Sequence, residues 1–109
     1  MLPYERVRRA IRDGAEDGNT ALVPFITAGY PEPNTFIDTL HAIASVGDVV
    51  EIGVPFSDPM ADGMTIQRSS FSAIENGVTL SWIFEQLDQS GKDVGIPLVM
   101  MSYLNPLLA

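Results

Sequence analysis

Several residue types that particular functions require are scarce in this sequence. It contains no cysteine, which excludes disulfides and thiolate metal sites, and its single histidine, His41, argues against a histidine-based metal centre. Its 109 residues include only 6 basic residues against 14 acidic ones, a net charge of −8. Four of the six basic residues lie within residues 6–12, so the rest of the chain lacks the clustered basic surface that nucleic acids and anionic membranes attract.

Long apolar runs are also missing. No run approaches the ~20 residues that span a bilayer, and the N-terminal "MLPYERVRRA" lacks the apolar core of a signal peptide. The sequence therefore favours a cytoplasmic location. Its length and its 46% hydrophobic content correspond to one domain or less.

Apolar periodicity predicts an α/β arrangement with a parallel sheet. The expected order is a helix, then strand–helix–strand–helix–helix–strand, and Asn34 and Thr79 are expected to cap two of the helices. Strands joined by helices pair in parallel, and these strands are continuous apolar runs, as parallel strands buried on both faces should be. The expected helices cover 4–13, 35–45, 65–75 and 80–90, and the expected strands cover 21–27, 48–53 and 96–102.

Three parallel strands do not make a complete fold by themselves. They neither close a barrel nor protect both edges, so the outer sides of 21–27 and 96–102 are expected to stay unpaired. The simplest interpretation is that residues 1–109 are the N-terminal portion of a single longer domain, the remainder of which is absent from this sequence.

A carboxylate inside the second strand is the clearest functional signal. Because side chains alternate across a strand, Val49 and Glu51 face one way and Val50 and Ile52 the other. If helices cover the second face, Glu51 faces the inside of a curved sheet, where α/β barrels build their active sites. Asp62 follows on the loop that leaves the same strand. Two such carboxylates suit proton transfer, with one acting as an acid and the other as a base.

Each acid also has a structural interpretation. Asp58 precedes Pro59 and fits a turn, and Asp62 before Gly63 fits another. A carboxylate pair can also bind a divalent metal, but no further ligands lie nearby in the sequence, so we expect no metal site. A carboxylate in the middle of a strand has few structural roles, and Glu51 is therefore the stronger catalytic candidate.

Three segments resemble the alpha subunit of tryptophan synthase. They are "VPFITAGYP", "VEIGVPFSDPMADGMTIQ" and "YLNP", and the resemblance extends over all 109 residues in order and spacing. It implies the N-terminal part of a (β/α)8 TIM barrel from a lyase of tryptophan biosynthesis, which cleaves indole-3-glycerol phosphate to indole and glyceraldehyde 3-phosphate. It also implies that Glu51 and Asp62 are the catalytic carboxylates and that Phe25 and Tyr103 line the indole pocket. From the sequence alone, both aromatic residues could equally be ordinary core residues.

The resemblance also implies a partner. The loop of Pro55, Phe56, Ser57, Asp58 and Pro59 would contact the beta subunit in an alpha2-beta2 heterotetramer. Pyridoxal phosphate would belong to that subunit, so no cofactor is expected in this chain. Met64 departs from the family, which commonly has proline there.

Length is the larger departure, because the family's phosphate-binding loops follow the seventh and eighth strands. We therefore expect residues 1–109 alone to be inactive. Two alternatives stay open: a non-catalytic module that docks on the beta subunit, and a different retro-aldol TIM-barrel enzyme.

Overall fold

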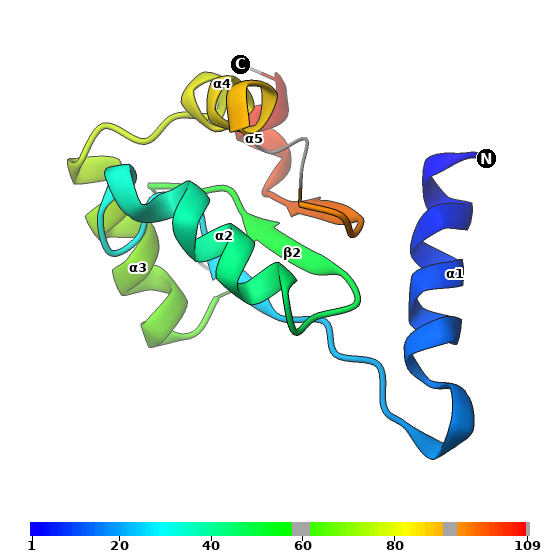
Figure 1. Ribbon diagram of the computed structural model, residues 1–109. Coiled ribbons are helices and arrows are strands. Elements are labelled where there is room, and N and C mark those ends of the chain that lie inside the picture. The colour runs from blue at the N-terminus through cyan, green and yellow to red at the C-terminus, as the bar shows by residue number, and fades with distance from the viewer. Residues whose placement is uncertain (58–61, 91–93, 109) are drawn as a thin grey trace.

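Helices and short strands alternate along the chain in the computed structural model, which describes residues 1–57, 62–90 and 94–108 (Figure 1). The order of elements confirms the predicted one up to the third strand. The elements are α1 (Pro3–Gly14), η1 (Glu16–Gly18), β1 (Phe25–Thr27), η2 (Pro33–Thr35), α2 (Phe36–Ala44), β2 (Val50–Gly53), α3 (Met64–Glu75), α4 (Leu80–Ser90), β3 (Leu98–Met101) and α5 (Leu104–Leu108).

The three strands form one parallel sheet in the order β1-β2-β3, as predicted. The register places Glu51 of β2 beside Phe25 of β1 and beside Val99 of β3. Paired residues in a parallel sheet point to the same face, so these three side chains share one face. The central strand therefore presents its carboxylate between an aromatic and an aliphatic neighbour.

The opposite face of the sheet carries the hydrophobic core. Val50 and Ile52 are fully buried there and pack with Phe36 and Leu40 of α2 and Ile83 of α4. Burying each of these large side chains contributes roughly 1.5–3 kcal/mol. The predicted alternation in β2 is therefore confirmed: helices cover the side of Val50 and Ile52, and Glu51 lies on the other side.

The strands are shorter than predicted. The expected strand at 21–27 is regular only over Phe25–Thr27, because Pro24 has no N–H to donate to a ladder. Pairing with the central strand continues irregularly before it, through an N–H of Asp48 that donates to the Leu22 carbonyl at 2.8 Å. The strands expected at 48–53 and 96–102 likewise reduce to Val50–Gly53 and Leu98–Met101.

The two predicted helix caps have different outcomes. Asn34 is not an N-cap, because a 3-10 turn over Pro33–Thr35 precedes α2 and moves its start to Phe36. Thr79 does cap α4, since its Oγ1 accepts the N–H of Trp82 at 3.1 Å. That hydroxyl satisfies one of the N–H groups that a helix start leaves without a partner.

The apolar face of α4 is rotated from the predicted one. The sequence pattern places Phe84 on the buried face with Leu80, Ile83 and Leu87, but Phe84 is 53% exposed. Trp82 takes its place against the core, where its ring lies 5.7 Å from that of Phe36. Tryptophan can cover the gap between α2 and α4 because it offers a larger apolar surface.

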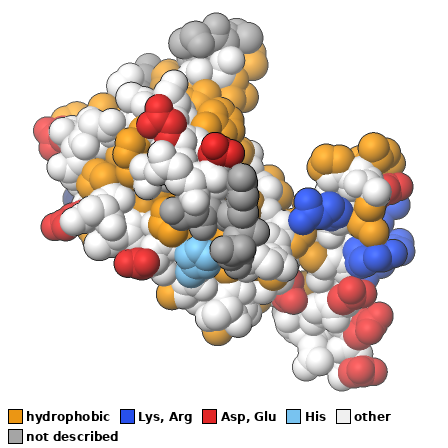
Figure 2. All heavy atoms as spheres, turned by 45° about the horizontal axis from the view of Figure 1, so that its top comes forward, with side chains coloured by type: hydrophobic (Ala, Val, Ile, Leu, Met, Phe, Trp, Pro, Cys, Tyr) orange, Lys and Arg blue, Asp and Glu red, His pale blue; other side chains and the backbone are white. Residues whose placement is uncertain are grey.

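The helix α1 lies apart from the sheet and from α2, α3 and α4 (Figure 1). Its start and end match the predicted helix, yet none of its residues is buried. It carries four of the five basic residues of the described chain, and Figure 2 shows blue side chains together on its side of the molecule. The fifth, Arg68, is exposed on α3. The short helix α5, which follows β3, was not predicted, because five residues are too few for a periodic pattern.

Candidate active site

A cavity of about 190 Å³ opens at the carboxyl ends of the strands. The last residues of β2 and β3, Gly53 and Met101, contribute to its wall. The start of β1, the residues after β2 and β3, and α3 with the residues before it supply the rest. Three of the sequence-predicted site residues lie in it together: Phe25, Asp62 and Tyr103. Its other lining residues are Val54, Ile66, Ser70 and Ser102.

Asp62 is fixed in this cavity by contacts to its side chain and to its backbone. The Tyr103 hydroxyl donates to Asp62 Oδ2 at 3.1 Å, and the Gln67 side-chain amide donates to the Asp62 carbonyl at 2.8 Å. The helix that follows is tied to β1 by a buried hydrogen bond of 2.7 Å between the Thr27 and Ser69 hydroxyls. The carboxylate therefore lies just before a helix that is anchored to the sheet.

The ring of Phe25 enters the cavity because the neighbouring strand has a glycine. A Cβ built on Gly53 would lie 2.4 Å from Phe25 Cζ and 2.8 Å from Phe25 Cε2, closer than real Cβ atoms approach other carbons. Gly53 is thus required for the close approach of a side chain rather than for its own backbone conformation. It lies two residues after Glu51, on the same face of β2.

Glu51 does not line the cavity. Its side chain is half-buried on the inner face of the sheet, level with Phe25 and Val99, one layer before Gly53. The structure therefore brings Asp62, Phe25 and Tyr103 together and leaves Glu51 behind them along the same strand face.

The loop after β2 begins with a buried residue. Pro55 is buried, Phe56 is half-buried and Ser57 is exposed. The Phe56 ring stacks on the Tyr103 ring, with centroids 5.0 Å apart and planes inclined by 28°. Asp58 and Pro59, the other two residues predicted to contact a partner, lie outside the described residues.

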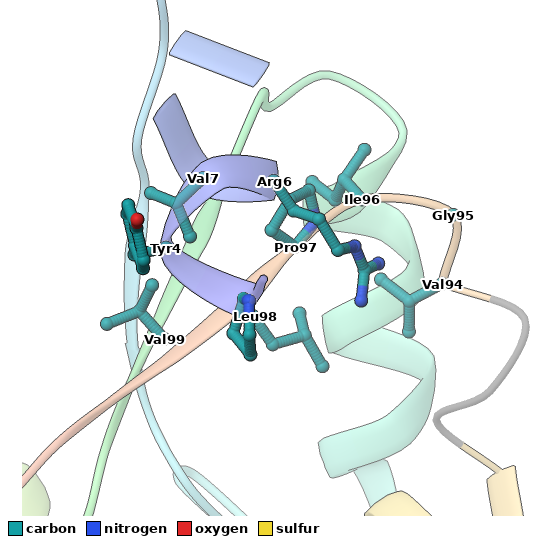
Figure 3. A pocket seen from close by; sticks show the side chains of 10 residues that line it. Tyr4, Arg6, Val7, Val94, Gly95, Ile96, Pro97, Leu98 and Val99 are labelled. Carbon is teal, nitrogen blue, oxygen red and sulfur yellow. The ribbon is translucent and has the colours of Figure 1, made fainter. Parts of the chain in front are cut away.

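A larger cavity of about 550 Å³ lies at the other end of the strands, between α1 and the start of β3 (Figure 3). Tyr4 and Val7 of α1 face Ile96, Pro97 and Leu98 across it. Its lining contains none of the candidate residues and, apart from Arg6 and the Tyr4 hydroxyl, is apolar or backbone. Size alone does not indicate a site here, because the cavity lacks convergent polar groups.

Within residues 1–57, 62–90 and 94–108, no three His, Cys, Asp or Glu side chains gather where they could hold a metal ion. No helix in the same ranges has the length and hydropathy needed to cross a bilayer.

Sequence reasoning missed two residues that shape the cavity. The position of Gly53 could have been predicted, because it lies two residues after the candidate Glu51 and so shares its face of the strand. The role of Gln67 could not have been predicted, since a side-chain hydrogen bond to a loop carbonyl leaves no pattern in the sequence. Phe56 was assigned only to a partner, and its stacking on Tyr103 joins two segments 47 residues apart in the chain.

Helices on one face of a parallel sheet, and a cavity with a carboxylate at the carboxyl ends of its strands, are features of (β/α)8 barrel enzymes, and this chain has the fold of the N-terminal part of such a barrel. A family model described as tryptophan synthase alpha chain matches residues 11–109. The chain belongs to the tryptophan synthase alpha chain family.

Curated relatives agree with this assignment. The tryptophan synthase alpha chain of Nitratidesulfovibrio vulgaris (strain DP4) is 46% identical over 108 residues, which are 98% of this chain and 42% of the relative. The alpha chain of Burkholderia cenocepacia (strain HI2424) is 46% identical over 104 residues, 94% of this chain and 38% of the relative. The chain thus spans about two fifths of the length of the curated relatives it matches.

Solved structures support the fold over nearly the same residues. A tryptophan synthase structure from Mycobacterium tuberculosis superposes with a TM-score of 0.84 at 30% identity and covers 94% of this chain and 41% of its own. The alpha subunit from Legionella pneumophila gives 0.83 at 32% identity, with 94% and 40% covered. A tryptophan synthase complex from Pyrococcus furiosus gives 0.74 at 38% identity, with 81% and 36% covered.

Proposed function

We propose that this chain supplies the acid–base pair for the retro-aldol cleavage of indole-3-glycerol phosphate to indole and glyceraldehyde 3-phosphate. The observation that carries the proposal is the cavity in which the Asp62 carboxylate lies with the rings of Phe25 and Tyr103. Two aromatic walls and one carboxylate suit a flat heterocycle that has a single N–H donor. Residues 1–109 would form the first part of one barrel domain.

The chemistry of the reaction assigns a different role to each carboxylate. The bond between indole C3 and the glycerol carbon breaks, C3 gains a proton, and the hydroxyl on that carbon loses one as the carbonyl forms. Glu51 would perform this proton transfer, because a glutamate side chain has enough freedom to reach forward from its place behind Gly53. Asp62 would accept the indole N–H and stabilise the positive charge that develops on the ring.

Asp62 can hold the indole N–H without losing its contact to the protein. A carboxylate has two oxygens and about four acceptor positions. Tyr103 donates to Oδ2, so Oδ1 can accept from the substrate. This arrangement would orient the ring between Phe25 and Tyr103 before the chemical step.

The test of the proposal is an indole-release assay on Asp62→Asn. Because the chain spans two fifths of its relatives, the assay uses a barrel chimera: residues 1–109 followed by the corresponding remainder of the Nitratidesulfovibrio vulgaris alpha chain. We expect kcat to fall about 10²- to 10³-fold. The control is Asp38→Asn, a change at an exposed position on α2. A chimera with Asp62→Asn that keeps the parental rate would contradict the role of Asp62.

We also expect residues 1–109 without the rest of a barrel to release no indole from this substrate, because the family's distal phosphate-binding loops are not among them. Measurable turnover by the 109-residue chain would show that these residues suffice for binding and chemistry.

The proposed partner is a tryptophan synthase beta subunit, which would hold the pyridoxal phosphate. The loop that begins at Pro55 would contact it, and Ser57 is the exposed residue of the described part of that loop. We expect Ser57→Arg in the chimera to weaken binding of the beta subunit, and Ser81→Arg at an exposed position on α4 to leave binding unchanged. Equal affinities of both variants for the beta subunit would show that the loop is not part of the interface.

A further inference from the structure

Two side-chain contacts join the loop after β2 to the candidate catalytic carboxylate. The Phe56 ring stacks on Tyr103 with centroids 5.0 Å apart, and the Tyr103 hydroxyl donates to Asp62 Oδ2 at 3.1 Å. Phe56 itself is not among the residues that line the cavity of Asp62. It lines a separate groove of about 360 Å³ on the outer surface of α3, beside Met64 and Phe71. The stacked rings therefore lie between the cavity and the outer surface.

The stack restricts how Tyr103 can move. A tyrosine hydroxyl is placed by only two side-chain torsions, so any contact that fixes the ring plane also fixes the hydroxyl. Tyr103 is half-buried and belongs to the segment between β3 and α5, outside regular secondary structure. It therefore depends on packing against a neighbouring side chain for its orientation, and Phe56 provides a contact of that kind.

We propose that Phe56 is a positioning residue for Asp62 that acts through Tyr103. The Phe56 ring holds the Tyr103 ring, and the Tyr103 hydroxyl holds one oxygen of Asp62 so that the other faces the substrate. This inference rests on the proposed function, in which Asp62 contacts the reacting ring. A protein that binds the loop at Phe56 and Ser57 would thereby affect the position of the Asp62 carboxylate. The effect would pass through the Phe56–Tyr103 stack and the Tyr103–Asp62 hydrogen bond.

The first test uses the 109-residue chain and follows the Tyr103 ring resonances by NMR. We expect Phe56→Ala to shift them, because the ring current of the stacked phenylalanine is lost. The control is Phe71→Ala, which removes a ring from the same groove, at a residue 61% exposed. Tyr103 resonances that respond equally to both substitutions would overturn the contact on which the proposal depends.

The second test is a double-mutant cycle on indole release by the barrel chimera without a beta subunit. We expect Phe56→Ala to lower kcat about tenfold with little change in KM, and Phe56→Trp, which keeps a stacking ring, to restore most of it. In a Tyr103→Phe background, Phe56→Ala should have less than a twofold effect, because the hydroxyl it positions is already gone.

The outcomes distinguish this inference from the proposed function. A kcat for Phe56→Ala no lower than that for Phe71→Ala would overturn the inference, as would an unchanged loss in the Tyr103→Phe background. Either result leaves the effect of Asp62→Asn untouched. Conversely, full activity of Asp62→Asn would contradict the proposed function, whatever the NMR experiment reveals about the two rings.

Discussion

The two ends of the sheet have cavities of opposite character. The one at the amino ends, beside α1, is the larger, about 550 Å³ against about 190 Å³ at the carboxyl ends. Only the smaller one contains a carboxylate, and that carboxylate accepts a hydrogen bond from a tyrosine in the same wall. The comparison shows that convergent polar groups, rather than volume, distinguish a candidate site in this molecule.

The carboxylates before, within and after β2 also differ in their hydrogen-bond partners. Asp48, just before the strand, accepts the Leu22 N–H at 2.7 Å through its own Oδ2. It joins the start of β2 to the chain that leads into β1, which is a structural role. Glu51 and Asp62, within and after the strand, have no comparable backbone N–H bond among the side-chain hydrogen bonds of the described residues. Position along one strand thus separates a structural carboxylate from the two candidate catalytic ones.

Of four substitutions that test this comparison, Glu51→Gln should lower activity the most. Glutamine keeps the shape of the side chain but cannot transfer a proton, so kcat for indole release by the barrel chimera should fall about 10³-fold. Circular dichroism should show an unchanged fold, because the side chain is only half-buried. Glu75→Gln, at an exposed position that ends α3, is the matched control. Near-parental turnover of Glu51→Gln would contradict a role for Glu51 in the proton transfer.

Gly53→Ala should have the next largest effect. The new methyl group would collide with Phe25 Cζ, and the ring would have to move within the cavity. We expect KM for the indole substrate to rise about tenfold, in line with the cost of overpacking. Gly63→Ala is the control, because a Cβ there meets nothing within 4 Å. The same KM for both variants would mean that the position of the Phe25 ring does not matter for binding.

Asp48→Ala should change stability rather than catalysis. It removes the acceptor of the Leu22 N–H, and because Leu22 is 49% exposed, water can replace that partner. The free energy of unfolding should therefore fall by only about 1 kcal/mol in urea denaturation. Asp88→Ala, on the exposed side of α4, should leave it unchanged. A loss of kcat without loss of stability would contradict the structural assignment of Asp48.

Val7→Ala should have the smallest effect of the four. The side chain is half-buried at the wall of the amino-end cavity, so its truncation should cost roughly 0.5 kcal/mol of stability or less. Indole release by the chimera should be unchanged. An effect on KM as large as that of Gly53→Ala would mean that the larger cavity takes part in substrate binding.

The sequence predicted the features that depend on local pattern. Alternation in β2 located Glu51 correctly on the face opposite Val50 and Ile52, and helix periodicity located α3 and α4 to within a residue or two. A long, specific motif carried the family assignment. The 3-10 turn at Pro33 and the exchange of Phe84 for Trp82 could not be predicted, because both depend on how α2 and α4 pack in three dimensions.

For the candidate site, the residues themselves could be predicted, but not their arrangement. Phe25, Asp62 and Tyr103 come from three separate segments, and resemblance to a family named all three. That Glu51 lies behind the cavity, and that Phe56 packs on Tyr103, follows from side-chain packing between segments far apart in the sequence. No periodic pattern encodes such contacts.

Indole itself provides the most direct test of the account, because the chain has three tyrosines and two of them mark the two cavities: Tyr103 at the carboxyl ends of the strands and Tyr4 at the amino ends. The measurement is an indole titration of the chain with labelled tyrosine, followed by NMR. We predict that the Tyr103 ring resonances move with a saturable dependence on indole concentration, while those of Tyr4 do not. Movement of Tyr4 with Tyr103 unchanged would contradict the assignment of the site.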